Sequence, residues 1–328
     1  MHPPSLLQAT MSNPTNPAAA KSVSANANAT IGKSHSGYIG RFAPSPTGPL
    51  HFGSVLAAVA SYMDAKANNG LWLLRMEDLD PPREPAGAAD QILQQLTQLG
   101  LHWDGEVLYQ SQRLKNYAEA LKELQDRQLC YRCDCSRSQI RNMGSVYDGR
   151  CRQRLTPASH EFAVRVKTDA KAIEFLDLIQ GAHQHAIYTE TGDFVIRRKD
   201  KLFAYQLAVV VDDEYQGITH VIRGFDLLDS TPRQIYLQQL LDYSTVVYGH
   251  IPIVINALGD KISKQTFAPA ADIQNSSRLL HQCLNFLGQA APGALLNAEP
   301  QSLLAWGIEH WDIHAVPKLA TIRQDAPK

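Results

Sequence analysis

The fold of this chain is decided by RFAPSPTGPLHFGS, the stretch that runs from Arg41 to Ser54. A short apolar strand at 38–43 leads into a proline-rich loop, and a predicted helix then starts near residues 53–54, ends at Asn69 and is stopped by Gly70. A helix that starts soon after a strand offers free N–H groups and the positive end of its dipole to an anion. The stretch therefore predicts an α/β fold with an anion site around His51.

Strands and helices alternate along the chain beyond this stretch. The apolar run 71–76 is short and is followed by an acidic loop, which is typical of a buried parallel strand. Pro85 suits the first turn of a helix that ends at residues 99–100, and another helix is predicted over 113–128. This order predicts a parallel sheet with right-handed crossovers. Further strands are predicted at 162–167, 173–179, 194–198, 207–211 and 251–255, a further helix at 231–243, and helices after 265.

Composition and charge exclude several classes of protein. The chain is 44% hydrophobic and 19% charged, which excludes a wholly disordered protein. Its 31 basic and 32 acidic residues give a net charge of −1, which excludes a polybasic binder but not an enzyme with a local basic groove. The longest apolar run, 207–211, is far shorter than the ~18 residues of a membrane span. Residues 1–37 contain no aromatic and no acidic residue and are predicted to form a disordered tail.

The cysteines indicate a metal site. Four of the five lie between Cys130 and Cys151, and such crowding without a signal peptide indicates metal ligation rather than disulfides. Thiolates at this density fit a tetrahedral structural zinc with Zn–S distances of about 2.3 Å. On the cysteines alone, the ligands would be Cys130, Cys133, Cys135 and Cys151. Cys283 lies among leucines and a phenylalanine and is predicted to be a buried apolar side chain.

A second constellation is Lys261-Ile262-Ser263-Lys264-Gln265, which follows Gly259. Two lysines three residues apart suit a loop that closes over a triphosphate, although a solvated surface loop would be the simpler interpretation of this motif alone. Together with the His-x-Gly some 210 residues earlier, on an α/β frame, the motif resembles the HIGH and KMSKS elements of class I aminoacyl-tRNA synthetases.

Three longer motifs resemble the glutamyl branch of that family: RMEDLD at 75–80, YQLAVVVDD at 205–213 and IRGFDLL at 222–228. The resemblance covers about residues 38–290. Ser54 stands where the last histidine of HIGH is expected, and Ile262 where a methionine is expected; Ser54 is predicted to cap the helix instead, and Ile262 to pack.

The resemblance implies a class I, Rossmann-like α/β catalytic domain with a parallel sheet, a zinc-bearing insertion and a short helical C-terminal region. The expected divisions are a disordered tail at 1–37, the first half of the catalytic domain at 38–129, a zinc-bearing and α+β insertion at 130–200, the second half with the KISKQ loop at 201–265, and a helical region at 266–328.

The resemblance also implies activation of L-glutamate by ATP with Mg²⁺, in which His51 and Lys264 stabilise the transition state electrostatically. Physical chemistry agrees, because two carboxylates and one ammonium require cationic forks, an anion and a hydroxyl. The implied glutamate-binding residues are Arg41, Phe42, Ala43, Pro44, Ser45, Glu77, Tyr205 and Arg223. The implied ATP-binding residues are His51, Gly53, Ser54, Lys261, Ser263 and Lys264.

For the metal, the resemblance implies one structural zinc held by Cys133, Cys135, Tyr147 and Cys151. Tyrosine is an uncommon zinc ligand, so Cys130 remains the rival fourth donor to Tyr147.

The combination of HFGS, KISKQ and only 63 residues after Gln265 resembles the members of the branch that attach glutamate to queuosine at the first anticodon position of tRNA(Asp). An enzyme whose active site meets the anticodon needs no distant module to read it, so this acceptor is the expected one. The resemblance further implies a cytoplasmic monomer. Two alternatives stay open: a compact glutamyl-tRNA synthetase that charges the 3′ end of tRNA(Glu), and a catalytically silent zinc-bearing RNA-binding paralogue. The silent paralogue is disfavoured because both lysines of KISKQ, His51 and Glu77 are all intact.

Overall fold

The computed structural model describes residues 37–144, 146–154, 161–256 and 270–323. The predicted tail up to residue 36 and the whole KISKQ motif lie outside the described residues. None of the described helices is long and apolar enough to cross a membrane.

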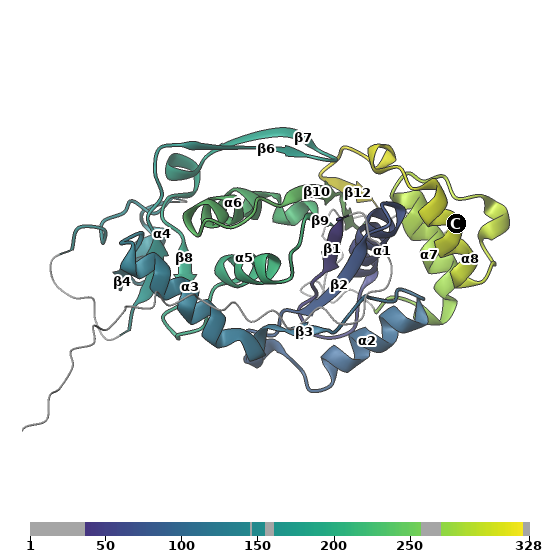
Figure 1. Ribbon diagram of the computed structural model, residues 1–328, viewed down its shortest axis with the longest axis horizontal. Coiled ribbons are helices and arrows are strands. Elements are labelled where there is room, and N and C mark those ends of the chain that lie inside the picture. The colour runs from purple at the N-terminus through teal and green to yellow at the C-terminus, as the bar shows by residue number, and fades with distance from the viewer. Residues whose placement is uncertain (1–36, 145, 155–160, 257–269, 324–328) are drawn as a thin grey trace, which may run out of the picture. The chain divides into compact units, whose positions relative to one another are not determined.

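A parallel sheet forms the centre of the described chain (Figure 1). Strands β1, β2 and β3 pair in that order, and β9 pairs with β10. The two groups meet at Thr219, whose backbone N–H donates to the carbonyl oxygen of Ile39 at 2.9 Å. The resulting order is β3-β2-β1-β9-β10. The bounds are β1 Ile39–Phe42, β2 Leu71–Met76, β3 Leu108–Tyr109, β9 His220–Gly224 and β10 Val247–Ile251.

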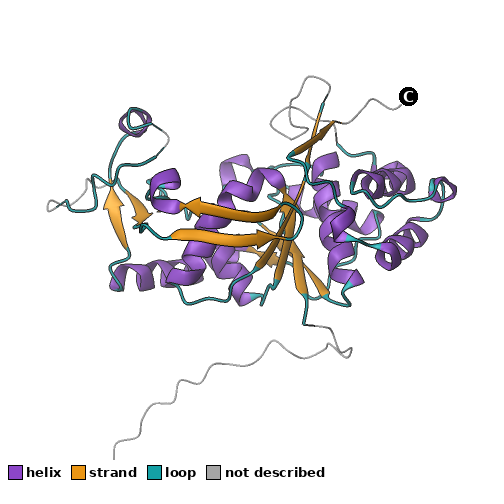
Figure 2. Cartoon of the chain, turned by 90° about the horizontal axis from the view of Figure 1, so that it is seen from above, coloured by secondary structure: helices purple, strands orange, loops and turns teal. Residues whose placement is uncertain are grey.

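Helices cover both faces of this sheet (Figure 2), as a parallel sheet requires. Alternate residues of β2 show the two faces, because Trp72 and Leu74 belong to one hydrophobic cluster and Leu73 packs against the other. The first cluster includes α1 Phe52–Ala67, α2 Ala88–Gln98, α7 Ser276–Phe286 and α8 Pro300–His310. The second includes α3 Leu114–Asp126, α5 Tyr205–Tyr215 and α6 Thr231–Leu240.

These elements confirm the predicted α/β class and most of the predicted strands and helices. The strand predicted at 207–211 is wrong, because this run lies inside helix α5. All five of its residues are buried, and the buried acids Asp212 and Asp213 follow them. An apolar run of this length is compatible with a buried strand and with a helix buried all round, and periodicity does not distinguish them. The tertiary packing of the buried run 207–211 therefore determines that it forms a helix.

The segment after α3 leaves the parallel sheet, as predicted. It forms an antiparallel sheet of β4 Cys130–Cys133, β5 Ala163–Val166 and β8 Val195–Arg197, with the short helix α4 Arg137–Arg141. A hairpin of β6 Ala172–Asp177 and β7 Gly181–Ala186 follows β5 and reaches back to the central sheet, where the N–H of Leu178 donates to the carbonyl oxygen of Tyr248 at 2.9 Å.

The C-terminal part is helical, as predicted, with one exception. Strand β11 Ile253–Ile255 pairs in parallel with β12 Thr321–Arg323, a strand that the sequence did not predict. Pro252 separates β11 from β10, because a proline has no N–H to continue a strand ladder.

Candidate active site

A cavity of about 660 Å³ opens at the carboxyl ends of the neighbouring strands β1 and β9, where ligands of open α/β sheets bind. Every predicted glutamate- or ATP-binding residue that the structure describes lines it: Arg41, Phe42, Ala43, Pro44, Ser45, His51, Gly53, Ser54, Glu77, Tyr205 and Arg223. The fold thus brings together eleven predicted residues from four separate segments of the chain in one cavity. Lys261, Ser263 and Lys264 lie outside the described residues.

Arg41 is the last residue but one of β1, and its side chain contacts a buried acid. Its Nε lies 3.3 Å from Oδ1 of Asp213, and Nη2 of Arg75 approaches the same oxygen at 2.8 Å. Burial alone would raise the pKa of Asp213, but the guanidinium groups of Arg75 and Arg41 outweigh this effect and hold that pKa below its usual value. Asp213 is therefore an anion that fixes Arg41 at the cavity wall.

Glu77 follows β2 directly and presents a carboxylate to the same cavity. Its N–H donates to the carbonyl oxygen of Pro44 at 3.0 Å, which ties the acidic loop to the proline loop. Its buried Oε1 has no hydrogen-bond partner among the described residues, since Nη2 of Arg75 is 3.8 Å away. Burial raises the pKa of Glu77 to about 7, although Arg75 and Arg41 oppose that rise. A buried carboxylate without a donor is suited to receive a cation.

Tyr205 and Arg223 also line the cavity. Tyr205 is the first residue of helix α5, and burial raises the pKa of its hydroxyl, so it stays protonated. Arg223 lies in β9, is 4% exposed, and its guanidinium carbon lies 5.0 Å from the ring centre of Tyr248. Arg41, Glu77, Tyr205 and Arg223 thus bring two guanidinium groups, one carboxylate and one phenol to the cavity.

The N-terminus of α1 forms the floor of the cavity. His51 is the N-cap residue, and its Nδ1 accepts the backbone N–H of Ser54 at 3.3 Å, while its Nε2 lies 2.9 Å from the hydroxyl of Ser54. The prediction that Ser54 caps the helix is therefore wrong: it pairs with the cap. A histidine with an extended backbone can cap a helix because its ring nitrogen reaches the first free N–H groups.

The sequence missed several residues of the cavity. Thr47, Arg83, Gly224 and Asp226 also line it. Gly224 lies close to Asp226: a Cβ at residue 224 would lie 2.6 Å from Oδ1 of Asp226, so that side chain would have to move. Gly224 and Asp226 fall within the IRGFDLL motif, so the sequence contained a signal for them. The motif alone does not show which of its residues faces a ligand.

The cysteine cluster lies apart from this cavity, beside the short strand β4. The thiols of Cys133, Cys135 and Cys151 lie within 4.8 Å of one another and are buried, so they can hold a metal ion. Oη of Tyr147 lies 3.3 Å from Sγ of Cys133 and 3.6 Å from Sγ of Cys135. A tetrahedral site with bonds of about 2.3 Å needs ligand atoms about 3.8 Å apart, so these four residues fit it.

Cys130 is not part of that cluster. It lies at the other end of β4, opposite Val166, and packs against the second hydrophobic cluster. Burial raises the pKa of its thiol to about 11. Cys283 is fully buried in the first hydrophobic cluster, as predicted.

This fold, with an anion-binding helix start and a charged cavity at the carboxyl ends of β1 and β9, is that of a class I tRNA synthetase catalytic domain. Residues 39–287 match the family model of tRNA synthetases class I (E and Q), catalytic domain. The chain is 49% identical over 296 residues to the glutamyl-Q tRNA(Asp) synthetase of Dechloromonas aromatica (strain RCB), which covers 88% of this chain and 98% of that protein. It is 51% identical over 292 residues to the protein of the same name from Neisseria meningitidis serogroup A, with 86% and 98% covered. The chain therefore belongs to the class I tRNA synthetases of the E and Q type, within the glutamyl-Q tRNA(Asp) synthetase family.

Solved structures agree on the fold. A glutamate tRNA ligase from Elizabethkingia meningosepticum, in complex with its amino acid, is similar with a TM-score of 0.72 and 24% identity, over 87% of this chain and 66% of that one. A glutamate-tRNA synthetase from Elizabethkingia anophelis is similar with a TM-score of 0.73 and 24% identity, over 88% and 68%.

Proposed function

We propose that this chain activates L-glutamate with ATP and transfers the glutamyl group to queuosine at the first anticodon position of tRNA(Asp). The observation that carries the proposal is the meeting of Arg41, Glu77, Tyr205 and Arg223 in one cavity at the start of α1. Two guanidinium groups match the two carboxylates of glutamate, and the Glu77 carboxylate, whose Oε1 accepts no hydrogen bond among the described residues, matches its ammonium. The relatives from Dechloromonas aromatica and Neisseria meningitidis are both named glutamyl-Q tRNA(Asp) synthetase, which supports tRNA(Asp) as the acceptor.

In the first step, an oxygen of the glutamate α-carboxylate attacks the α-phosphorus of ATP. A P–O bond forms, the bond from that phosphorus to the bridging oxygen of the β-phosphate breaks, and pyrophosphate leaves. The N–H groups at the start of α1 and the His51 ring are placed to stabilise the phosphate charge, and Gly53 lets a nucleotide approach the backbone. We assign Lys261, Ser263 and Lys264 to the same phosphates. Mg²⁺ that accompanies ATP supplies further charge neutralisation.

In the second step, a hydroxyl of queuosine attacks the carbonyl carbon of the glutamyl-adenylate. An ester bond forms, AMP leaves, and the hydroxyl proton passes to the leaving phosphate. The reaction needs no covalent intermediate with the protein, so orientation of the acceptor and stabilisation of charge carry the catalysis.

We further propose that Cys133, Cys135, Tyr147 and Cys151 hold one zinc ion. The short distances from Oη of Tyr147 to the thiols, and the place of Cys130 at the far end of β4, favour the tyrosine over Cys130 as fourth ligand. When bound, zinc would tie the end of β4 to the loop of residues 147–151 and so stabilise a segment with a small core of its own.

The test is the transfer of radiolabelled glutamate to three acceptors: tRNA(Asp) that contains queuosine, tRNA(Asp) that carries guanosine at that position, and tRNA(Glu). Label is expected only in the first. A fourth acceptor, queuosine-containing tRNA(Asp) without its 3′-terminal adenosine, separates the two ends of the molecule and should still be labelled. Efficient charging of tRNA(Glu) that needs the terminal adenosine would refute the proposed acceptor and establish the compact glutamyl-tRNA synthetase instead.

A further inference from the structure

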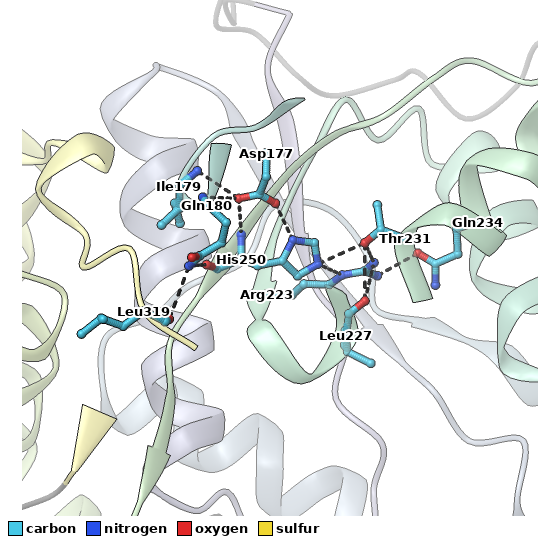
Figure 3. A network of polar contacts seen from close by, with 9 residues as sticks. All are labelled: Asp177, Ile179, Gln180, Arg223, Leu227, Thr231, Gln234, His250 and Leu319. Carbon is cyan, nitrogen blue, oxygen red and sulfur yellow. Dashed lines mark hydrogen bonds and ion pairs between the residues drawn. The ribbon is translucent and has the colours of Figure 1, made fainter. Parts of the chain in front are cut away.

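Arg223 lines the cavity and also belongs to a buried polar network, whose other members have no role in the proposed chemistry (Figure 3). The network contains His250 of β10 and Asp177 at the end of β6, both at most 2% exposed. Neither side chain lines the cavity. Asp177 contacts His250, and His250 contacts Arg223. Burial of ionisable groups is costly, so a functional role for these two residues is worth testing.

Asp177 is fixed as a hydrogen-bond acceptor. Its Oδ1 accepts the backbone N–H groups of Ile179, Gln180 and His250 at 3.0, 2.8 and 3.1 Å. Its Oδ2 lies 2.5 Å from Nδ1 of His250. Burial alone would raise the pKa of this carboxyl, but the contacts with His250 and the backbone N–H groups hold it below its usual value. A carboxylate can only accept, so the imidazole carries its proton on Nδ1.

This tautomer leaves the lone pair of Nε2 facing Arg223. The Nε–H of Arg223 donates to Nε2 of His250 at 3.0 Å. The other arms of the guanidinium donate to Oε1 of Gln234 at 2.8 Å, to Oγ1 of Thr231 at 2.8 Å and to the carbonyl oxygen of Leu227 at 3.3 Å. The group is thus fixed by four acceptors on three elements, and its five N–H donors leave one for a ligand within the described structure.

The ring of His250 is neutral at ordinary pH. Burial lowers its pKa to about 4, against the opposing effect of Asp177 and with the further effect of the Arg223 cation. A neutral ring is required here, since a second ring proton on Nε2 would point at the Nε–H of Arg223.

We propose that Asp177 and His250 are positioning residues of the glutamate site: Asp177 selects the Nδ1–H tautomer of His250, and the bare Nε2 of that ring sets the orientation of the Arg223 guanidinium toward the substrate carboxylate. This inference rests on the proposed function for the identity of the substrate. It makes amino-acid affinity depend on the β6–β7 hairpin, which carries Asp177 into contact with β10 and contributes no residue to the cavity.

The variant that tests the proposal is Asp177→Asn, which keeps the shape of the side chain. Three backbone N–H groups hold the amide oxygen in the place of Oδ1, so the amide nitrogen takes the place of Oδ2 and donates to the ring. The ring proton must then move to Nε2, where it opposes the Nε–H of Arg223 and has Oγ1 of Thr231, 3.2 Å away, as its other neighbour. A change of tautomer at constant geometry is a known consequence of an Asp-to-Asn exchange beside a histidine. The expected result is a KM for glutamate about ten- to a hundredfold higher, with the KM for ATP unchanged within about twofold.

The matched control is Asp193→Asn. Asp193 is 1% exposed and, like Asp177, accepts backbone and side-chain hydrogen bonds, here from Thr168, Tyr131 and Arg152. None of these partners lines the cavity. The substitution therefore has the same chemistry and a comparable structural cost, and it should leave the KM for glutamate unchanged. Thermal unfolding of both variants separates a loss of fold from a loss of affinity.

A spectroscopic measurement decides the tautomer without reference to activity. In a ¹⁵N-histidine NMR spectrum of the whole protein, the His250 signal is identified by its disappearance in His250→Gln. It should show a proton on Nδ1 from pH 6 to 8 in the natural protein and on Nε2 in Asp177→Asn. A proton on Nε2 or a charged ring in the natural protein would overturn the proposal, as would a switched tautomer with an unchanged KM for glutamate. If the natural protein shows no glutamate-dependent ATP–pyrophosphate exchange, the proposed function fails and the glutamate role of this network fails with it, while the spectrum still decides the arrangement around Arg223.

Discussion

Replacement of Glu77 by glutamine should stabilise the fold and weaken glutamate binding at the same time. Burial moves the pKa of this carboxyl from an ordinary 4.5 to about 7. At 1.36 kcal/mol for each pH unit, the charged form is disfavoured in the folded chain by about 3 kcal/mol. The unfolded chain releases this proton near pH 4.5 and the folded chain near pH 7. Folding stability therefore falls as the pH rises between these values, and the full penalty is present above pH 7.

Glutamine has no charge to bury, so Glu77→Gln should unfold at higher urea concentration at pH 8, by up to about 3 kcal/mol in free energy, and should match the natural protein near pH 4. The same variant should raise the KM for glutamate about ten- to a hundredfold at pH 8, because the ammonium loses a charge-assisted acceptor. In the natural protein that KM should rise about tenfold from pH 8 to pH 6 as Glu77 is protonated, and in the variant it should not depend on pH in this window.

Urea unfolding at pH 8 and pH 4, and ATP–pyrophosphate exchange at varied glutamate, measure the two effects. Glu123→Gln is the control, because Glu123 lies exposed on α3 and pairs only at the surface with Arg127. It should change neither quantity. A Glu77→Gln variant that is no more stable than the natural protein at pH 8, or that binds glutamate equally well, would refute the reasoning.

Three further predictions follow from the site. Lys264→Ala should lower the rate of glutamate-dependent ATP–pyrophosphate exchange about 10²- to 10³-fold, because the cation that we assign to the phosphates is removed; an unchanged rate would exclude Lys264 from the mechanism. Arg223→Ala should raise the KM for glutamate strongly and leave that for ATP nearly unchanged, and glutamine should be a poor substrate; equal effects on both KM values would indicate a folding defect. Native mass spectrometry should find one zinc, which Cys151→Ser loses. Zinc that survives Tyr147→Phe but not Cys130→Ser would show that the tyrosine is not the fourth ligand.

The sequence predicted the elements whose signals are local. The run 71–76 is strand β2 to the residue, and the Pro85 helix and the 231–243 helix are present with shifted ends. The prediction failed at 207–211, because five consecutive buried apolar residues are compatible with either a strand or a helix. The helical conformation of 207–211 is determined by the packing of α5 between the sheet and α3. There the buried Asp212 accepts hydrogen bonds from Gln110 and Tyr117. Such contacts span about a hundred residues and leave no local pattern.

The distinction between local signals and long-range contacts also applies to the residues of the candidate site. Arg41, Glu77 and Arg223 were identified because each lies inside a long motif. His250 and Asp177 are 73 residues apart, and neither stands in a motif that indicates a partner. Their relation exists only after the hairpin has folded back onto β10. A lone histidine and a lone aspartate have no spacing from which sequence alone can predict a hydrogen bond.

The two arginines of the cavity differ in how a buried acid supports them, and this difference bears on their strength as anion binders. Arg41 touches Asp213 directly at 3.3 Å, so part of its positive charge is already neutralised. Between Arg223 and Asp177 stands the neutral ring of His250, which transmits orientation through two hydrogen bonds and keeps the negative charge a ring width farther away. Coulomb attraction falls with distance, so the acid behind Arg223 compensates less of its charge than Asp213 does for Arg41. A histidine between acid and arginine therefore fixes the Arg223 guanidinium in place while leaving more of its positive charge for the carboxylate that its remaining N–H meets.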